Sequence, residues 1–254
     1  MRTDVLETSE DAVLGGRLRL RQPLTGHRVG HDAILLAAVT GGHAGEHVID
    51  FGAGVGAAGL ALAVRVAGLK VTLVEIDPAL CALAEGNARL NNLADQVSVL
   101  AADSEDADAL AAAGIGGADR VLMNPPFHDA SRQNLSPDPR RRLAHAAAPG
   151  LLRHWVASAA RLLKPQGVLT LIWRADALAE VQRELTAEFG SIAVLPVYPR
   201  PNAPAIRVLV RAVKSGGGAP ETFPGLILND QHSKPTAAAE AVLRGGGTLS
   251  ITET

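Results

Sequence analysis

The stretch HVIDFGAGVGAAGLALAVRVAGLKVTLVEI, residues 47–76, decides the fold. It begins with a short β-rich run (47–52), passes through a glycine-rich turn into a helical segment (57–68), and ends in a second β-rich run (70–76). Glycines let a backbone turn tightly and approach a ligand closely, and a helix that starts after such a turn presents unbonded N–H groups. This order of segments predicts a βαβ unit of a parallel sheet.

Strand-like and helix-like segments continue to alternate along the chain. Helices are expected at 78–93, 105–114, 151–163 and 177–190, and strands at 97–103, 118–124 and 167–173. Two strand-like segments, 191–200 and 205–214, then flank a turn without a helix between them. We therefore expect an α/β fold with a seven-stranded, mostly parallel sheet, a C-terminal antiparallel hairpin and helices on both faces. This pattern resembles the class I methyltransferase (Rossmann-like) fold.

Three regions are expected along the chain. Residues 1–45 contain short strands and a helix that begins near Asp32, and they are expected to cover a cofactor site. Residues 46–214 form the methyltransferase-like domain. Residues 215–254 combine a linker with a strand-like and a helix-like segment, and we expect this appendage to pack on the same domain.

Composition limits the classes of protein. Hydrophobic residues make up 47% of the 254 residues, and Cys81 is the only cysteine, which excludes a disulfide framework and a thiolate metal cluster. No apolar run is long enough to span a bilayer, and the first residues lack the apolar core of a secretory signal. We expect a cytoplasmic protein without a metal ion or membrane partner, as a monomer or homodimer.

Charge is distributed unevenly. The net charge is −2, yet residues 130–215 carry 13 basic against 5 acidic side chains. This segment contains the run Arg140, Arg141 and Arg142, which is a candidate for contact with RNA phosphates. Arginines on solvated faces and in a solvated loop explain the same pattern equally well, so both interpretations stay open.

The glycine-rich turn has the spacing Asp50-x-Gly52-x-Gly54-x-Gly56, and Glu75 ends the next strand. A carboxylate at that strand end is placed to accept hydrogen bonds from ribose hydroxyls. The same turn also matches a dinucleotide fingerprint, which is a real alternative. The Asp50 spacing resembles the S-adenosylmethionine (SAM) loop of class I methyltransferases, where such a carboxylate lies near the cationic end of the cofactor. The alternatives for Asp50 and Glu75 are a capping role and a solvated strand end.

The strand at 118–124 ends in Asn124-Pro125-Pro126-Phe127. Prolines are poor inside a sheet but stiffen the loop at a strand's end. The tetrad resembles the motif of methyltransferases that act on planar, conjugated nitrogens such as the amine of adenine and the amide of glutamine. The Asn124 side-chain oxygen and the Pro125 carbonyl would each accept an N–H of the target, and Phe127 would stack on its plane. No strong base is required, because the nitrogen becomes acidic once it has been methylated.

Other positions around this edge of the sheet are candidates for the cofactor site. Asp103 ends the strand at 97–103 and is followed by Ser104, at a position where class I methyltransferases commonly contact the adenine amine, although Asp103 could instead cap a helix. Gly30 and Asp32 resemble a motif near the methionine end, with helix capping as the alternative for Asp32. The expected cofactor-binding residues are Asp50, Gly52, Ala53, Gly54, Gly56, Glu75, Ile76, Asp103, Ser104, Gly30 and Asp32.

Over nearly its whole length the chain resembles the bacterial tRNA valine adenine-N6 methyltransferases. The resemblance rests on RLRLRQPLTGHRVGHDAILLAA, VIDFGAGVG, MNPPF, RRLAHAAAPGLLRHWVASAARLLKPQGVLTLIWR, PVYPRPNAPAIRVLVRAVK and LILNDQ. It implies a SAM-dependent enzyme that methylates the exocyclic N6 of an adenine in RNA, with tRNA near the anticodon as the expected substrate.

Three alternatives remain open. A protein glutamine-N5 methyltransferase uses the same tetrad on the same fold, but its relatives carry a separate N-terminal helical domain. Here about 45 residues, which look partly β, precede the first strand of the methyltransferase-like domain. A non-catalytic RNA-binding module would need neither the tetrad nor the glycine turn. A dinucleotide-binding oxidoreductase would leave the tetrad without a role.

Overall fold

The computed structural model describes residues 7–25, 28–126 and 150–251. The strands are β1 (Thr8–Val13), β2 (Leu18–Pro23), β3 (His47–Phe51), β4 (Lys70–Glu75), β5 (Val97–Ala101), β6 (Ala118–Met123), β7 (Leu163–Arg174), β8 (Phe189–Tyr198), β9 (Arg207–Lys214), β10 (Glu221–Thr222) and β11 (Leu226–Ile227). The helices are α1 (His31–Thr40), α2 (Ala57–Arg65), α3 (Pro78–Leu90), α4 (Ala107–Ala112), α6 (Leu151–Leu162), α7 (Leu178–Leu185) and α8 (Ala237–Leu243), with 3₁₀ turns η1 (Leu14–Gly16) and η3 (Ala175–Ala177).

One large sheet organises the molecule. Its strands follow the order β10-β8-β9-β7-β6-β3-β4-β5. β11 also pairs with β8, at residues further along β8 than those that pair with β10. Five neighbouring strands are mutually parallel, namely β7, β6, β3, β4 and β5, whereas β9 runs antiparallel to both β7 and β8. The predicted class I methyltransferase fold is confirmed. The two short strands β10 and β11 extend the seven predicted strands at the β8 edge.

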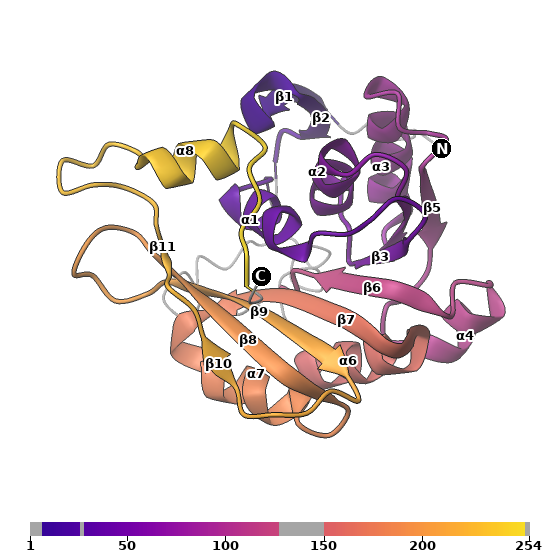
Figure 1. Cartoon of the computed structure of the whole chain (residues 1–254). Helices are drawn as coiled ribbons and strands as arrows, with labels where there is room; N and C mark the ends of the chain where they lie inside the picture. The colour runs from indigo at the N-terminus through magenta and orange to yellow at the C-terminus, as the bar shows by residue number, and fades with distance from the viewer. Residues whose placement is uncertain (1–6, 26–27, 127–149, 252–254) are drawn as a thin grey trace.

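Helices cover both faces of this sheet (Figure 1). On one face α1, α2 and α3 enclose a core that includes Val48, and on the other α4, α6 and α7 enclose a core that includes Ile49 and Phe51. Successive residues of a strand point to opposite faces, so β3 supplies side chains to both layers. The same alternation places Asp50 on the α2 side of the sheet.

The N-terminal hairpin β1–β2 forms a separate two-stranded sheet beside α2 and α3 (Figure 1). β1 has the polar sequence TSEDAV, so hydrophobic patterning did not indicate it. Glu10 of β1 pairs with Arg19 and Arg21 of β2 across the hairpin. Leu18 and Leu20 are buried in the core shared with α2. Because β1 lacks an apolar face, the hairpin is held in place by the pairing of β1 with β2 and by the burial of the apolar side chains of β2.

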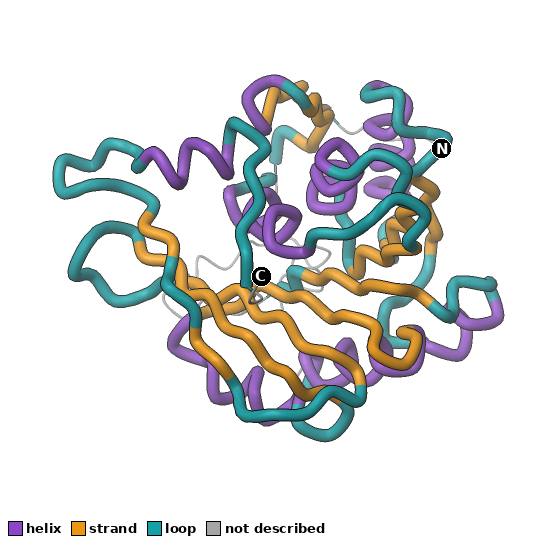
Figure 2. Tube along the Cα trace, in the orientation of Figure 1, coloured by secondary structure: helices purple, strands orange, loops and turns teal. Residues whose placement is uncertain are grey.

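The C-terminal residues run back along the domain (Figure 2). β10 lies within the segment expected to be a linker, where it pairs with β8 in parallel. After α8, the Leu249 N–H donates to the Ala38 carbonyl of α1 (2.9 Å), and Ile251 is buried. Arg65 donates to the carbonyls of Val242 (2.8 Å) and Gly247 (2.5 Å). The division of the chain into three regions stays a prediction.

Several element boundaries differ from the expectation, among them those of β7 and of α7 with β8. β7 begins at Leu163, directly after α6, because residues 163–166 continue the strand across a register shift opposite β6. α7 ends at Leu185 and β8 already begins at Phe189, which is buried against the core under α6 and α7. Within the described part of the chain, no helix combines the length and the apolar character needed to cross a membrane.

Candidate active site

The candidate residues gather at one edge of the sheet because β3, β4, β5 and β6 are parallel and their carboxyl ends meet there. Phe51 pairs with Met123, so Gly52 and Asn124 are the next residues on adjacent strand ends. Glu75 pairs with Ala101 at the ends of β4 and β5. Ligands of open α/β sheets bind at this edge.

The glycine turn is held by bonds to the neighbouring strand. The Ala53 N–H donates to the carbonyl of Val74 (2.9 Å), and the Gly56 N–H donates to the carbonyl of Ala53 (2.9 Å). Gly54 donates its N–H to Glu75 Oε2 (2.8 Å). The turn between β3 and α2 is therefore fixed by β4 before any ligand arrives.

Glu75 is buried, and each of its oxygens is used by the protein. Oε2 accepts from Gly54, and Oε1 accepts the N–H of Asp77 (2.9 Å). A carboxylate has about four lone-pair sites, so each oxygen retains one for a further donor. The alternative of a solvated strand end does not describe this residue, because only 7% of Glu75 is exposed.

Asp50 lies beneath the turn and is almost completely buried. Its Oδ2 accepts the N–H of Gly59 (2.8 Å) in the first turn of α2, which is the capping role considered as the alternative. Burial raises the pKa of the Asp50 carboxyl to about 7, opposed by the Gly59 bond and reinforced by the charge of Glu75. Contact of Asp50 with a cofactor stays a prediction.

This pKa makes stability depend on pH. The unfolded carboxyl ionises near its ordinary value of 3.8, whereas the folded one keeps its proton until about pH 7. The contribution of Asp50 to the free energy of unfolding therefore falls between these values as pH rises, by at most about 1.4 kcal/mol per pH unit. Asp50→Asn keeps an acceptor for Gly59 and removes this dependence.

Urea unfolding of ligand-free wild type and Asp50→Asn at pH 5 and pH 8 measures the effect. We expect the stability of wild type relative to the variant to be greater at pH 5 than at pH 8. An unchanged difference would mean that Asp50 titrates at the same pH in the folded and unfolded chains.

Asp103 and Ser104 follow β5. The Asp103 Oδ1 accepts the N–H of Glu105 (2.9 Å), whereas α4 is capped by Asp106, which accepts from Ala109 (2.9 Å). The alternative that Asp103 caps α4 is therefore wrong, because α4 starts two residues later than expected. Asp103 is exposed and Ser104 is buried.

Gly30 and Asp32 lie where α1 begins. Gly30 occupies the N-cap position without a side-chain cap, so the alternative of Asp32 as N-cap is wrong. Asp32 instead accepts from Arg207 Nε (2.9 Å) at the start of β9. The ion pair ties the first turn of α1 to the same edge of the sheet.

The tetrad follows β6 at this edge. Asn124 is half-buried, Pro125 is buried and Pro126 is exposed. Phe127 lies outside the described residues, as do Arg140, Arg141 and Arg142. Among the residues that the structure describes, no three His, Cys, Asp or Glu side chains gather as a metal site would require.

Comparison with known protein families shows which family the chain matches. Residues 29–197 match the model of the Methyltransferase small domain family, which covers β3 to β8 and the candidate site. The chain belongs to this family. Membership was expected from the sequence and is confirmed.

Individual relatives carry different names. The chain is 33% identical over 159 residues to a Porphyromonas gingivalis protein named tRNA1(Val) (adenine(37)-N6)-methyltransferase, covering 61% of this chain and 62% of that one. It is 30% identical over 157 residues to a release factor glutamine methyltransferase of Chlorobaculum tepidum, covering 59% and 53%. The chain thus spans about three fifths of the length of the first relative.

The fold of the chain agrees with that of a solved crystal structure. The crystal structure described as a predicted O-methyltransferase from Agrobacterium tumefaciens matches with a TM-score of 0.73 and 27% identity. The match covers 88% of this chain and 100% of that one.

The site of this small methyltransferase domain fits SAM, the cofactor that the family implies. Apart from Gly54 and its two chain neighbours, no atom of the described residues lies within 4 Å of the position where a Cβ would project from Gly54, so this part of the structure leaves open space at the turn. Ile76 exposes 65% of its surface directly after the buried Glu75. An exposed apolar side chain beside hydrogen-bond acceptors suits a nucleoside, whose base is flat and whose ribose carries hydroxyls.

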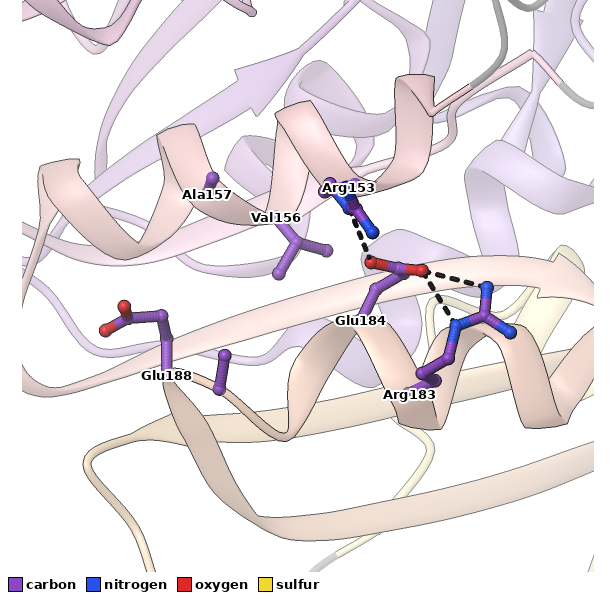
Figure 3. A pocket seen from close by; sticks show the side chains of 7 residues that line it. Arg153, Val156, Ala157, Arg183, Glu184 and Glu188 are labelled. Atoms are coloured by element: carbon purple, nitrogen blue, oxygen red, sulfur yellow. Dashed lines mark hydrogen bonds and ion pairs between the residues drawn. The ribbon is translucent and has the colours of Figure 1, made fainter.

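A hollow of about 370 Å³ lies elsewhere, between α6 and α7 (Figure 3). Glu184 stands at its rim and pairs with Arg153 (3.3 Å) and Arg183 (2.9 Å). None of the candidate residues that the structure describes lines this hollow. The sheet edge therefore remains the candidate active site.

Two residues of the site were missed in the sequence. Trp155 of α6 packs edge-on against Phe51, with ring centroids 6.1 Å apart and an interplanar angle of 84°. Asn87 of α3 is completely buried and donates to the Val55 carbonyl in the glycine turn. The i, i+4 spacing of Asn87 and Asn91 was the available signal, because two amides four residues apart share one helix face.

Proposed function

We propose that the protein transfers a methyl group from SAM to the exocyclic N6 of an adenine in RNA, with tRNA near the anticodon as the substrate. The observation that carries this proposal is the position of Asn124-Pro125 beside Gly52, one residue past the Phe51–Met123 pair. A target held by Asn124 would lie next to a ligand in the glycine turn. The name of the Porphyromonas gingivalis relative supports the choice of tRNA.

The cofactor would lie along the carboxyl ends of β3, β4 and β5. Gly52, Ala53, Gly54 and Gly56 would approach it with their backbone, and Glu75 would accept from its ribose. Ile76 would pack on the adenine, which Asp103 and Ser104 would contact at its amine. Gly30, Asp32 and Asp50 would lie toward the methionine end.

When bound, SAM supplies an electrophilic methyl group on a sulfonium. The Asn124 side-chain oxygen and the Pro125 carbonyl would each accept a hydrogen bond from one N–H group of the target amine. This orientation would point the lone pair of the amine at the methyl group. Transfer would form a nitrogen–carbon bond as the carbon–sulfur bond of the donor breaks, and the methylated nitrogen would then lose its proton to water. The rigid Pro125-Pro126 pair holds both acceptors in place.

Methyl transfer from isotope-labelled SAM to two pools tests the acceptor. One pool is bulk tRNA from a strain that lacks this gene, and the other is the protein fraction of the same lysate. We expect N6-methyladenosine in the tRNA on nucleoside mass spectrometry. Label found only in protein, at glutamine, would overturn the RNA proposal in favour of a glutamine-N5 methyltransferase.

A thermal shift assay tests the cofactor separately. A ligand that binds only the folded state stabilises it by about 2.7 kcal/mol at 100 times its dissociation constant. We expect SAM or its demethylated product to raise the melting temperature and NAD to leave it unchanged. The reverse result would favour a dinucleotide-binding protein.

A further inference from the structure

The outer edge of β2 is paired with side chains of a helix. The Arg21 N–H donates to Asn87 Oδ1 (2.7 Å), and Asn87 Nδ2 donates back to the Arg21 carbonyl (3.0 Å). Four residues further on, Asn91, the C-cap residue that follows α3, repeats this pattern with the N–H (2.9 Å) and carbonyl (2.7 Å) of Arg19. The side-chain amides of Asn87 and Asn91 thus form the hydrogen bonds that a neighbouring strand would otherwise form with this edge of β2.

The spacing of the two elements explains this pairing. Four residues of an α-helix rise about 6 Å, and two residues of a strand rise about 6.6 Å. The side-chain amides of Asn87 and Asn91, at positions i and i+4 along the end of α3, therefore match backbone groups at positions j and j−2 of β2, since the helix and the strand run in opposite directions. Exposed strand edges favour unwanted pairing, so this arrangement also covers an edge of the hairpin.

Asn87 differs from Asn91 in its burial and in the target of its third hydrogen bond. Its Nδ2 also donates to the Val55 carbonyl (3.0 Å), which lies between Gly54 and Gly56 in the glycine turn. Asn87 is completely buried, so water cannot replace these bonds. One amide therefore joins the N-terminal hairpin and the glycine turn.

The same strand also holds the segment that enters α1. The buried Gln22 of β2 accepts the N–H of Val29 at Oε1 (2.9 Å) and donates to Asp11 of β1 (2.9 Å). Val29 directly precedes Gly30, the N-cap of α1. β2 is thus bonded directly to the segment that enters α1, and to the glycine turn through the side chain of Asn87.

We propose that Asn87 is a positioning residue that couples the β1–β2 hairpin to the glycine turn and thereby sets the affinity for SAM. The inference rests on the proposed function in assuming that SAM binds at this turn. Asn91 bonds the same hairpin from the C-cap of the same helix, and its third bond goes to the Asn87 carbonyl (2.7 Å) rather than to the turn, so it provides a matched control.

The test compares Asn87→Leu with Asn91→Leu. Leucine is similar in shape to asparagine but cannot form its side-chain hydrogen bonds. A lost hydrogen bond to a buried group corresponds to about tenfold or more in binding. By calorimetric titration we expect Asn87→Leu to weaken SAM binding at least about tenfold and Asn91→Leu to change it less than about twofold. The KM for SAM should rise in Asn87→Leu, with kcat at saturating SAM retained within a few-fold.

Amide hydrogen exchange provides a second measurement that needs no variant. Because coupling between two sites is reciprocal, the demethylated product of SAM should slow exchange at Arg21 of the wild-type protein more than at Arg19. Equal effects at the two amides, or equal losses of SAM affinity in the two leucine variants, would overturn the role of Asn87. Wild type that binds SAM but methylates no RNA would instead contradict the proposed acceptor and leave this comparison valid.

Discussion

Asn124→Ala is expected to lower the turnover number for methyl transfer by roughly 10²–10³-fold, while the dissociation constant for SAM stays within about twofold of wild type. Asn124 would hold the target amine with its side-chain oxygen, and that contact matters most when the nitrogen attacks. Single-turnover transfer from labelled SAM to tRNA measures the chemical step, and calorimetric titration measures SAM binding.

Asn124→Asp is the control for this experiment. It keeps an acceptor oxygen at the end of β6, so we expect it to retain more activity than the alanine variant. Loss of SAM binding in a folded Asn124→Ala protein would contradict the assigned role, since Asn124 would then serve the cofactor. Equal activity of the alanine and aspartate variants would show that no acceptor is needed at this position.

Gly52→Ala is expected to destabilise the folded protein by about 2–5 kcal/mol. Gly52 has φ of +61°, where an L side chain is strained, and an added Cβ would lie 2.4 Å from Cη2 of Trp155. Trp155 is buried against Phe51, so it has little room to move. Urea unfolding gives the loss in free energy.

Gly54→Ala is the matched control, because Gly54 has φ of +58° but, beyond its chain neighbours, no atom of the part of the chain that the structure describes lies within 4 Å of the added Cβ. We expect a cost of about 1–2 kcal/mol from backbone strain alone. The difference between the two variants isolates the contact with Trp155. Equal costs would show that Trp155 shifts freely and that strain explains both losses.

Much of the fold could be predicted because the signals are local. Hydrophobic runs of strand length, separated by amphipathic helical segments, indicated β3 to β9 before any contact was known. The glycines after β3 and the prolines after β6 marked strand ends, and parallel strands bring those ends to one edge. The positions of Gly52, Glu75 and Asn124 follow from these two facts.

Contacts between distant segments could not be predicted in this way. β1 is polar and β10 has only two residues, so each depends on pairing with another strand rather than on its own pattern. The helix-capping alternatives for Asp32 and Asp103 were wrong because both helices begin at other residues, next to Gly30 and Asp106. Local capping rules rank residue types but leave the boundary to packing.

The sequence by itself determined the parallel sheet, the glycine turn after its first strand and the Asn-Pro pair after β6, because each depends on neighbouring residues in the chain. Only the tertiary structure decided that Asp50 is buried against Gly59, that Trp155 lies under Gly52, and that Asn87 joins β2 to the glycine turn. These contacts join residues from 9 to 103 positions apart, so they exist only once the helices have packed on the sheet.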